Sequence, residues 1–131
     1  MNEGRYGYET KLNKSFDDAV QTVTAELAKE GFGVLTTIDV KATLKKKIDA
    51  DFRPYVILGA CNPKLAHRAL STDAQIGLML PCNVVVQERE GAVEVSIINP
   101  GTMFNMMGDD SLKEVANEAD ERLRRVMAAL G

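Results

Sequence analysis

Two amphipathic helical patterns enclose a run of strand-like segments, and this order is the feature that most constrains the fold. The first pattern spans residues 15–31 and the second runs from Ser111 to Leu130. Both repeat apolar residues at three- and four-residue spacing. The strand-like runs between them, rich in apolar and β-branched residues, are 32–38, 55–61, 82–90 and 92–98. Helices at the two ends of a run of strands favour an α+β fold.

The ends of the two long helices are marked by their residue types. Ser15 is a suitable N-cap for the first helix, and Gly31 is a suitable left-handed stop. Ser111 and Glu114 match a capping box, which predicts the start of the last helix. Its predicted inner face consists of Leu112, Val115, Ala119, Leu123, Val126 and Leu130.

Shorter elements complete the predicted order. Residues 5–12 are typical of a first strand. Asp39 can cap a short helix that carries Val40, Leu44 and Ile48 on one face. A second short helix is expected after the third strand, since Asn62 is a good N-cap and Pro63 suits the first helical position. A turn near Glu90 and Gly91 joins the last two strands into a hairpin.

The predicted order is therefore strand, helix, four strands interrupted by two short helices, and a final helix. We expect one α+β domain over residues 1–131, with an antiparallel sheet covered on one face by the first and last helices. A chain of this length buries about two thirds of its unfolded surface, enough for a real core. If the four strands form a meander, Cys61 at the end of one lies near Cys82 at the start of the next.

Composition and charge limit the classes of function. Apolar residues make up 45% and charged residues 27%, as in soluble globular proteins, and no stretch approaches the roughly 20 apolar residues of a membrane span. The N-terminus has no apolar signal-peptide core, so we expect a cytoplasmic protein. A net charge of −3 argues against nucleic-acid binding. The exception is Lys41, Lys45, Lys46 and Lys47, for which a solvated helix face is favoured over a phosphate or acidic-partner patch.

The candidate site consists of two Cys-Asn pairs, Cys61-Asn62 and Cys82-Asn83. Cys61 precedes a helix cap, where the positive end of the helix dipole and free N–H groups can lower the pKa of a thiol. A thiolate there can act as a nucleophile, a redox centre or a soft-metal ligand, with the asparagines orienting an amide or carbonyl group. The alternative is structural: both cysteines are small buried hydrophobes, and the asparagines cap a helix and a turn.

His67, six positions after Cys61, is the residue that first suggests catalysis. It falls roughly 130 degrees from the centre of the inner face predicted for its helix. That face consists of Leu65, Ala66, Ala69 and Leu70. We therefore expect His67 on the outside, which argues against a Cys-His dyad. Two cysteines and one misdirected histidine also fall short of a structural zinc site, so no catalytic residue, metal ligand set or cofactor is predicted.

The segment 99–110 is rich in Gly and Asn, yet it holds Met103, Phe104, Met106 and Met107. It can form a pliable lid over an apolar ligand or a contact with a second subunit. We favour the subunit contact, because two-fold dimers are the commonest oligomers. A Cu(I) site that adds one methionine thioether to the two thiols is a further alternative.

The stretches "TIDVKATLKKKID" and "GACNPKLAHRALSTDAQIGLMLPCNVVV" resemble the domain-of-unknown-function 302 family. The family pattern pairs a Cys-Asn-Pro helix start with a later Leu-Pro-Cys-Asn-Val, and the resemblance extends from about Tyr6 to Leu130. The matching positions are Cys61, Asn62, Pro63, Leu80, Pro81, Cys82, Asn83 and Val84. The resemblance implies a TATA-binding-protein-like α+β arrangement and no particular activity, because similar scaffolds host unrelated functions. His67 is not part of the pattern.

These observations predict a non-enzymatic small-molecule-binding or accessory domain that forms a homodimer. Its pocket is expected around Cys61, Asn62, Cys82 and Asn83. The alternative prediction is a thiol-based redox or soft-metal-handling protein that uses Cys61 and Cys82.

Overall fold

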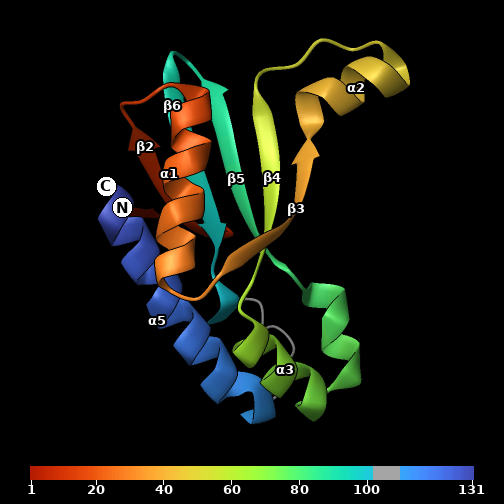
Figure 1. Ribbon diagram of the computed structural model, residues 1–131, viewed down its shortest axis with the longest axis vertical. Coiled ribbons are helices and arrows are strands. Elements are labelled where there is room, and N and C mark those ends of the chain that lie inside the picture. The colour runs from red at the N-terminus through yellow and green to blue at the C-terminus, as the bar shows by residue number, and fades with distance from the viewer. Residues whose placement is uncertain (102–109) are drawn as a thin grey trace.

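The structure, a computed structural model, describes residues 1–101 and 110–131. Its six strands form one antiparallel sheet in the order β1-β2-β6-β5-β4-β3 (Figure 1). The strands are β1 (Asn2–Glu3), β2 (Gly7–Leu12), β3 (Gly33–Asp39), β4 (Tyr55–Cys61), β5 (Cys82–Arg89) and β6 (Ala92–Ile98). The helices are α1 (Phe16–Lys29), α2 (Val40–Ile48), α3 (Pro63–Thr72) and α5 (Lys113–Leu130), with short 3₁₀ helices η1 (Ala74–Met79) and η2 (Asp110–Leu112).

The predicted α+β class and meander are confirmed. Strands β3 to β6 pair antiparallel in sequence order, and β2 returns to pair with β6. The turn between β5 and β6 has positive φ at Glu90 and Gly91, the conformation that a tight hairpin requires. The two-residue strand β1 was not predicted from the sequence. Met103, Phe104, Met106 and Met107 lie outside the described residues, so the expectations placed on them stay predictions.

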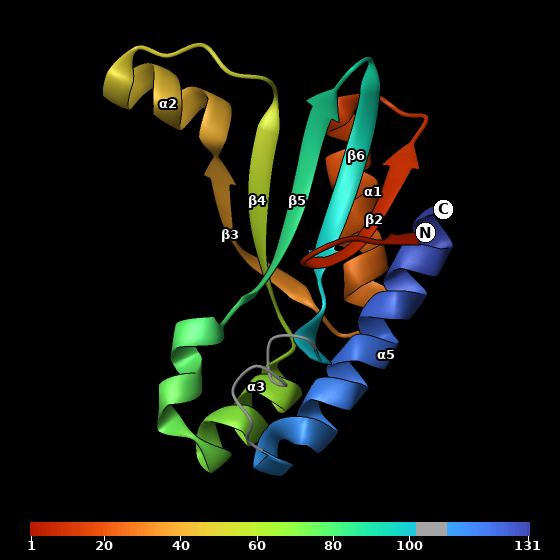
Figure 2. The same ribbon diagram turned by 180° about the vertical axis from the view of Figure 1, so that it is seen from behind.

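Helices α1 and α5 cover one face of the sheet (Figures 1 and 2). Alternate residues of each central strand point into the core between the sheet and these two helices, because successive side chains of a strand face opposite sides. In β5 and β6 these are the buried residues Val84, Val86, Val93, Val95 and Ile97. Ser15 caps α1 by accepting a hydrogen bond of 3.2 Å from the Asp18 N–H, as predicted. Within the described residues, none of the helices has the length and apolar character needed to cross a membrane.

The start of α5 differs from the prediction. The helix begins at Lys113 after the turn η2, and its N-cap, Leu112, makes no side-chain capping bond. The capping box of Ser111 and Glu114 was therefore wrong. Leu112, which takes the N-cap position, is fully buried in the core. The predicted stripe is buried apart from Leu130, which is only partly covered.

Helix α2 follows β3 with the predicted N-cap, because the Asp39 carboxylate accepts a 2.9 Å hydrogen bond from the Ala42 N–H. None of its residues is buried, however. Figures 1 and 2 both place α2 beyond the end of β3 and beside the start of β4, away from α1 and α5. Its expected apolar face, which includes Ile48, is not part of the core.

Core burial predicts a clear contrast between two leucines. Leu58 of β4 is 1% exposed and Leu78 of η1 is 83% exposed. We expect Leu58→Ala to lower the free energy of unfolding by about 2–5 kcal/mol, because it leaves a cavity in the core. Leu78→Ala should change it by about 0.5 kcal/mol or less. Equilibrium urea unfolding of both variants measures the difference, and equal losses would contradict the assigned core.

Candidate functional site

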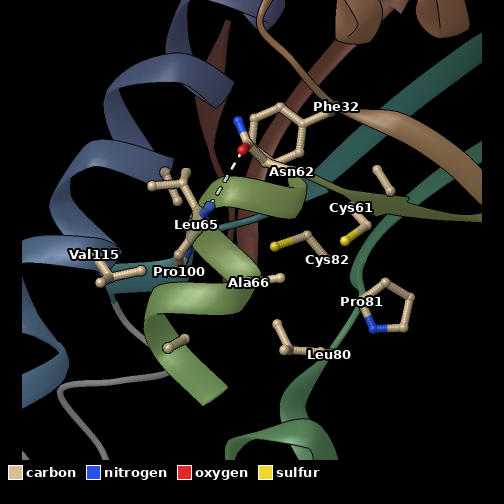
Figure 3. Close-up of a pocket in the computed structure, with 13 residues that line it drawn as sticks. Phe32, Cys61, Asn62, Leu65, Ala66, Leu80, Pro81, Cys82, Pro100 and Val115 are labelled. Carbon is tan, nitrogen blue, oxygen red and sulfur yellow. Dashed lines mark hydrogen bonds between the residues drawn. The ribbon is translucent and has the colours of Figure 1, made fainter. Parts of the chain in front are cut away.

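The two thiols meet at one end of the sheet. Cys61 is the last residue of β4 and Cys82 is the first of β5, and the pairing of the two strands sets Ala60 opposite Cys82. Strand spacing and rise then put the Cα atoms of Cys61 and Cys82 about 6 Å apart, within the Cα range of a disulfide. Cys61 follows Ala60, which shares the face of Cys82, so the Cys61 side chain must turn at the end of β4 to meet Cys82. Both cysteines are free thiols and line the same pocket (Figure 3). The proximity expected from the meander is present.

That pocket is small and largely apolar. Its cavity is about 40 Å³, room for a few water molecules at roughly 10–15 Å³ each. Small-molecule sites usually offer roughly 300–1,000 Å³. The lining consists of Phe32, Ala60, Cys61, Asn62, Leu65, Ala66, Ala69, Leu80, Pro81, Cys82, Pro100, Val115 and Ala119. Such a cavity has room for a single ion or for oxidation of the cysteine sulfurs, but not for most organic molecules.

Cys61 and Cys82 differ in access to solvent. Cys61 is partly exposed, whereas Cys82 is 9% exposed. Burial, reinforced by the neighbouring Cys61, raises the pKa of the Cys82 thiol to about 11. Near neutral pH, Cys82 is therefore almost entirely a neutral thiol, and Cys61 is the accessible member of the pair.

Close packing of β3, β4 and the segment before β5 positions the thiols. A Cβ atom on Gly59 would overlap Thr36 Oγ1 and lie 2.8 Å from Pro81 Cγ. Glycine at position 59 therefore allows the threonine of β3 and the proline to approach the backbone of β4. Pro81 directly precedes Cys82, so this approach holds the start of β5 against the end of β4.

Asn62 has a structural role that uses both ends of its amide. Its side-chain oxygen accepts a hydrogen bond of 3.3 Å from the Leu65 N–H, which caps α3 as predicted. Its Nδ2 donates a 3.4 Å hydrogen bond to the Glu30 carbonyl at the end of α1. Gly31 takes a positive φ of 85° there, and a Cβ atom would lie 3.0 Å from Asn62 Nδ2. Because Asn62 directly follows Cys61, these two hydrogen bonds also fix the backbone next to the thiol.

Sequence reasoning missed the residues that surround this contact. Arg122 Nη1 donates to the same Glu30 carbonyl at 3.2 Å, and Arg125 Nε donates to the Glu30 carboxylate at 2.9 Å. The end of α1, the start of α3 and the middle of α5 are joined here. The arginines also complement the negative end of the α1 dipole. The spacing of Arg122 and Arg125 places them on one helix face, but no pattern in the sequence names Glu30 as their partner.

Asn83 does not join the pocket, which corrects the expectation that both Cys-Asn pairs meet there. It is exposed and lines a shallow groove with Tyr55 and Ser96 on the sheet face that α1 and α5 leave open. Successive strand residues face opposite sides, so burying Cys82 turns Asn83 outward. The structure therefore brings together Cys61, Asn62 and Cys82 of the four predicted residues.

His67 is exposed, as predicted, and Leu65 and Ala69 form the buried face of α3. Leu70 is 42% exposed, so its assignment to that face was wrong. Within residues 1–101 and 110–131, no three His, Cys, Asp or Glu side chains are grouped to hold a metal ion. The four α2 lysines are exposed, and Lys45 pairs with Asp49 at 2.8 Å. This favours the solvated helix face.

Comparison with known proteins agrees with the motif positions. The model of the family described as "Domain of unknown function DUF302" matches residues 8–130. The chain belongs to this family. It is also similar to a solved structure of an uncharacterised conserved DUF302 protein from Bacillus stearothermophilus, with 31% identity and a TM-score of 0.90. That match covers 98% of this chain and 100% of the other. No curated protein matches the chain.

Unequal burial predicts unequal alkylation of the two thiols of this DUF302 protein. Cys61 should react with iodoacetamide near neutral pH, whereas Cys82 should react at a rate that rises about tenfold per pH unit toward its pKa of about 11. Peptide mass spectrometry after timed quenching resolves the two sites. Equal rates near neutral pH would contradict the assigned burial of Cys82.

The asparagines of the two Cys-Asn pairs should differ in their effect on stability. Asn62→Ala removes the α3 cap and the bond to Glu30, so we expect a loss of about 0.5–2 kcal/mol in the free energy of unfolding. Asn83→Ala, at an exposed position, should change it by about 0.5 kcal/mol or less. Equilibrium unfolding compares the two, and a larger loss for Asn83→Ala would count against the contacts described.

Proposed function

We propose that this protein is a thiol-based redox protein in which Cys61 and Cys82 interconvert between a dithiol and an intramolecular disulfide. The observation that carries the proposal is the shared pocket of two free thiols, one partly exposed and one buried. A cytoplasmic location, where thiols are kept reduced between oxidation events, belongs to the same proposal.

Cavity size favours this chemistry over stable binding of an organic molecule. The space of about 40 Å³ beside the sulfurs is too small for most metabolites. A disulfide needs little additional room, because its two sulfur atoms already line the pocket. The apolar lining also shields the bond once it has formed, since few polar groups face the pocket.

The step requires an oxidant, and a small hydroperoxide suits a cavity of about 40 Å³. The Cys61 thiolate attacks the terminal oxygen of the hydroperoxide, which forms Cys61 sulfenic acid and releases an alcohol or water after protonation. The Cys82 sulfur then attacks the Cys61 sulfur, a disulfide forms, and the hydroxyl leaves as water. Two electrons pass from the thiol pair to the peroxide bond. Two external thiols restore the pair by successive exchange through a mixed disulfide and are themselves joined as a disulfide.

Burial of Cys82 should slow the second step. Its pKa of about 11 leaves little thiolate near neutral pH, and the thiolate is the attacking form. The raised pKa is the folded-state value, so the thiolate fraction of Cys82 rises about tenfold per pH unit above neutral and reaches one half near pH 11. The Cys61 sulfenic acid should therefore persist long enough to be trapped near neutral pH.

Stoichiometric hydroperoxide should convert the reduced protein to a species lighter by two hydrogens, with Cys61 and Cys82 linked in the peptide map. Dimedone should trap Cys61 in the wild type partially and in Cys82→Ser completely. Disulfide formation should accelerate with pH above neutral. Cys61→Ser is the matched control and should give neither product. Failure of the wild type to form the intramolecular disulfide would overturn the proposal.

A second candidate function is binding of a small apolar molecule, with the protein acting as a non-enzymatic accessory domain. The apolar lining of the pocket favours it, because ligand sites are also lined mainly by apolar side chains. Asn62 is engaged with Leu65 and Glu30, and Asn83 is outside the pocket, so Cys61 and Cys82 would be the polarisable contacts. A soft ion such as Cu(I) held by two thiolates is the corresponding metal-handling form. Native mass spectrometry of protein purified with and without reductant distinguishes a retained molecule or ion from a disulfide.

A further inference from the structure

The two cysteines differ in how firmly they are held, which decides which sulfur moves when a disulfide forms. Cys82 is buried and lies in register opposite Ala60. Pro81, which precedes it, packs against Gly59. Cys61, in contrast, is the last residue of β4 and is partly exposed. Because Ala60 already shares the face of Cys82, the Cys61 side chain is the one that must turn to join the sulfurs.

The residue after Cys61 is held by two long hydrogen bonds. Asn62 Oδ1 accepts from the Leu65 N–H at 3.3 Å, the bond drawn in Figure 3. Asn62 Nδ2 donates to the Glu30 carbonyl at 3.4 Å. Both distances exceed the usual range of about 2.7–3.2 Å, so a lengthening of about 0.3 Å would break either bond. Because the two residues are adjacent, a turn of the backbone at Cys61 also moves Asn62.

We propose that closing the disulfide between Cys61 and Cys82 releases Asn62 from both of its hydrogen bonds, so that oxidation of the thiols loosens the start of α3. This coupling rests on the proposed redox function, and within it Asn62 is a positioning residue. Its two bonds favour the dithiol over the disulfide. By reciprocity, the free energy with which these bonds oppose the disulfide equals the free energy with which the disulfide weakens them.

The junction of α1, α3 and α5 can lose Asn62 without leaving the Glu30 carbonyl unpaired. Arg122 Nη1 donates to the same carbonyl at 3.2 Å and remains in place. An unpaired buried carbonyl would oppose the release strongly, and Arg122 removes that obstacle. Of the two partners of Asn62, only the Leu65 N–H then loses its hydrogen bond. The change is therefore confined to the first turn of α3.

The second half of α3 has its own attachment to α5. Arg68 Nη1 donates to the Glu118 carboxylate at 3.2 Å, and Ala69 is buried in the core. Neither contact involves Asn62. Oxidation should therefore open the start of the helix locally while the rest of α3 stays packed.

Equilibration with glutathione tests the coupling. Glutathione disulfide oxidises the thiol pair and leaves as two glutathione thiols, so intact mass gives the equilibrium constant for forming the protein disulfide. Asn62→Ala loses both bonds and should raise this constant about two- to thirtyfold, the range that corresponds to loss of a helix cap. Asn62→Ser keeps a capping hydroxyl but loses the donor to Glu30, so it should give a smaller rise.

Ser15→Ala is the matched control. It removes the cap of α1, where Ser15 accepts a hydrogen bond from the Asp18 N–H, and Ser15 does not line the pocket. It should lower stability as Asn62→Ala does but leave the equilibrium constant unchanged. An unchanged or lower constant for Asn62→Ala, in a protein whose wild type forms the disulfide, would overturn the coupling alone. Absence of the disulfide in the wild type would overturn both the coupling and the proposed function.

Amide exchange of the wild type tests the release even if Asn62→Ala fails to fold. Exchange of the Leu65 N–H, followed by NMR, should be faster in the oxidised than in the reduced protein, because its acceptor is withdrawn. The Asp18 N–H, capped by Ser15 in the same way, is the internal reference and should not change. A cross-link that only rigidifies the chain would slow exchange at Leu65. Equal or slower exchange there after oxidation would therefore refute the release of Asn62.

Discussion

The pairing of β4 with β5 is the constraint on which both the core and the candidate site depend. The register that sets Leu58 opposite Val84 turns both side chains toward α1 and α5, where they are 1% and 0% exposed. The same register sets Ala60 opposite Cys82 at the end of the ladder. A slip of one residue would expose the core side chains, so burial fixes the position of the thiols.

The three helices near the site depend on a second, local constraint. The Glu30 carbonyl at the end of α1 accepts hydrogen bonds from Asn62 at the start of α3 and from Arg122 of α5. Carbonyl groups at a helix end have no partner within the helix, so side chains from elsewhere must satisfy them. Here Asn62 and Arg122 satisfy the carbonyl, and they hold together α1, α3 and α5. Residues of α3 and α5 line the pocket. Asn62 is therefore better explained as the residue that orients Cys61 than as a ligand-binding group.

Much of this fold was predictable because local chemistry and global burial agree. Ser15, Asp39 and Asn62 each cap the helix that their sequence context predicts. The capping box at Ser111 was misleading, because a 3₁₀ turn precedes the helix and the buried Leu112 takes the N-cap position. The sequence could not show that Asn83 faces away from the pocket until the register of β5 was known, and it could not pair Glu30 with arginines more than ninety positions away. The TATA-binding-protein-like resemblance of the fold stays a prediction.

We propose that Cys61 and Cys82 form one reversible two-electron pair, and a redox titration tests this most directly. The protein is equilibrated in glutathione buffers of graded potential, quenched with acid, and its disulfide fraction is measured by intact mass. We predict a single transition with a two-electron slope, approached equally from the reduced and the oxidised protein. Mixed glutathione adducts on Cys61 without an intramolecular disulfide at any potential would contradict the account.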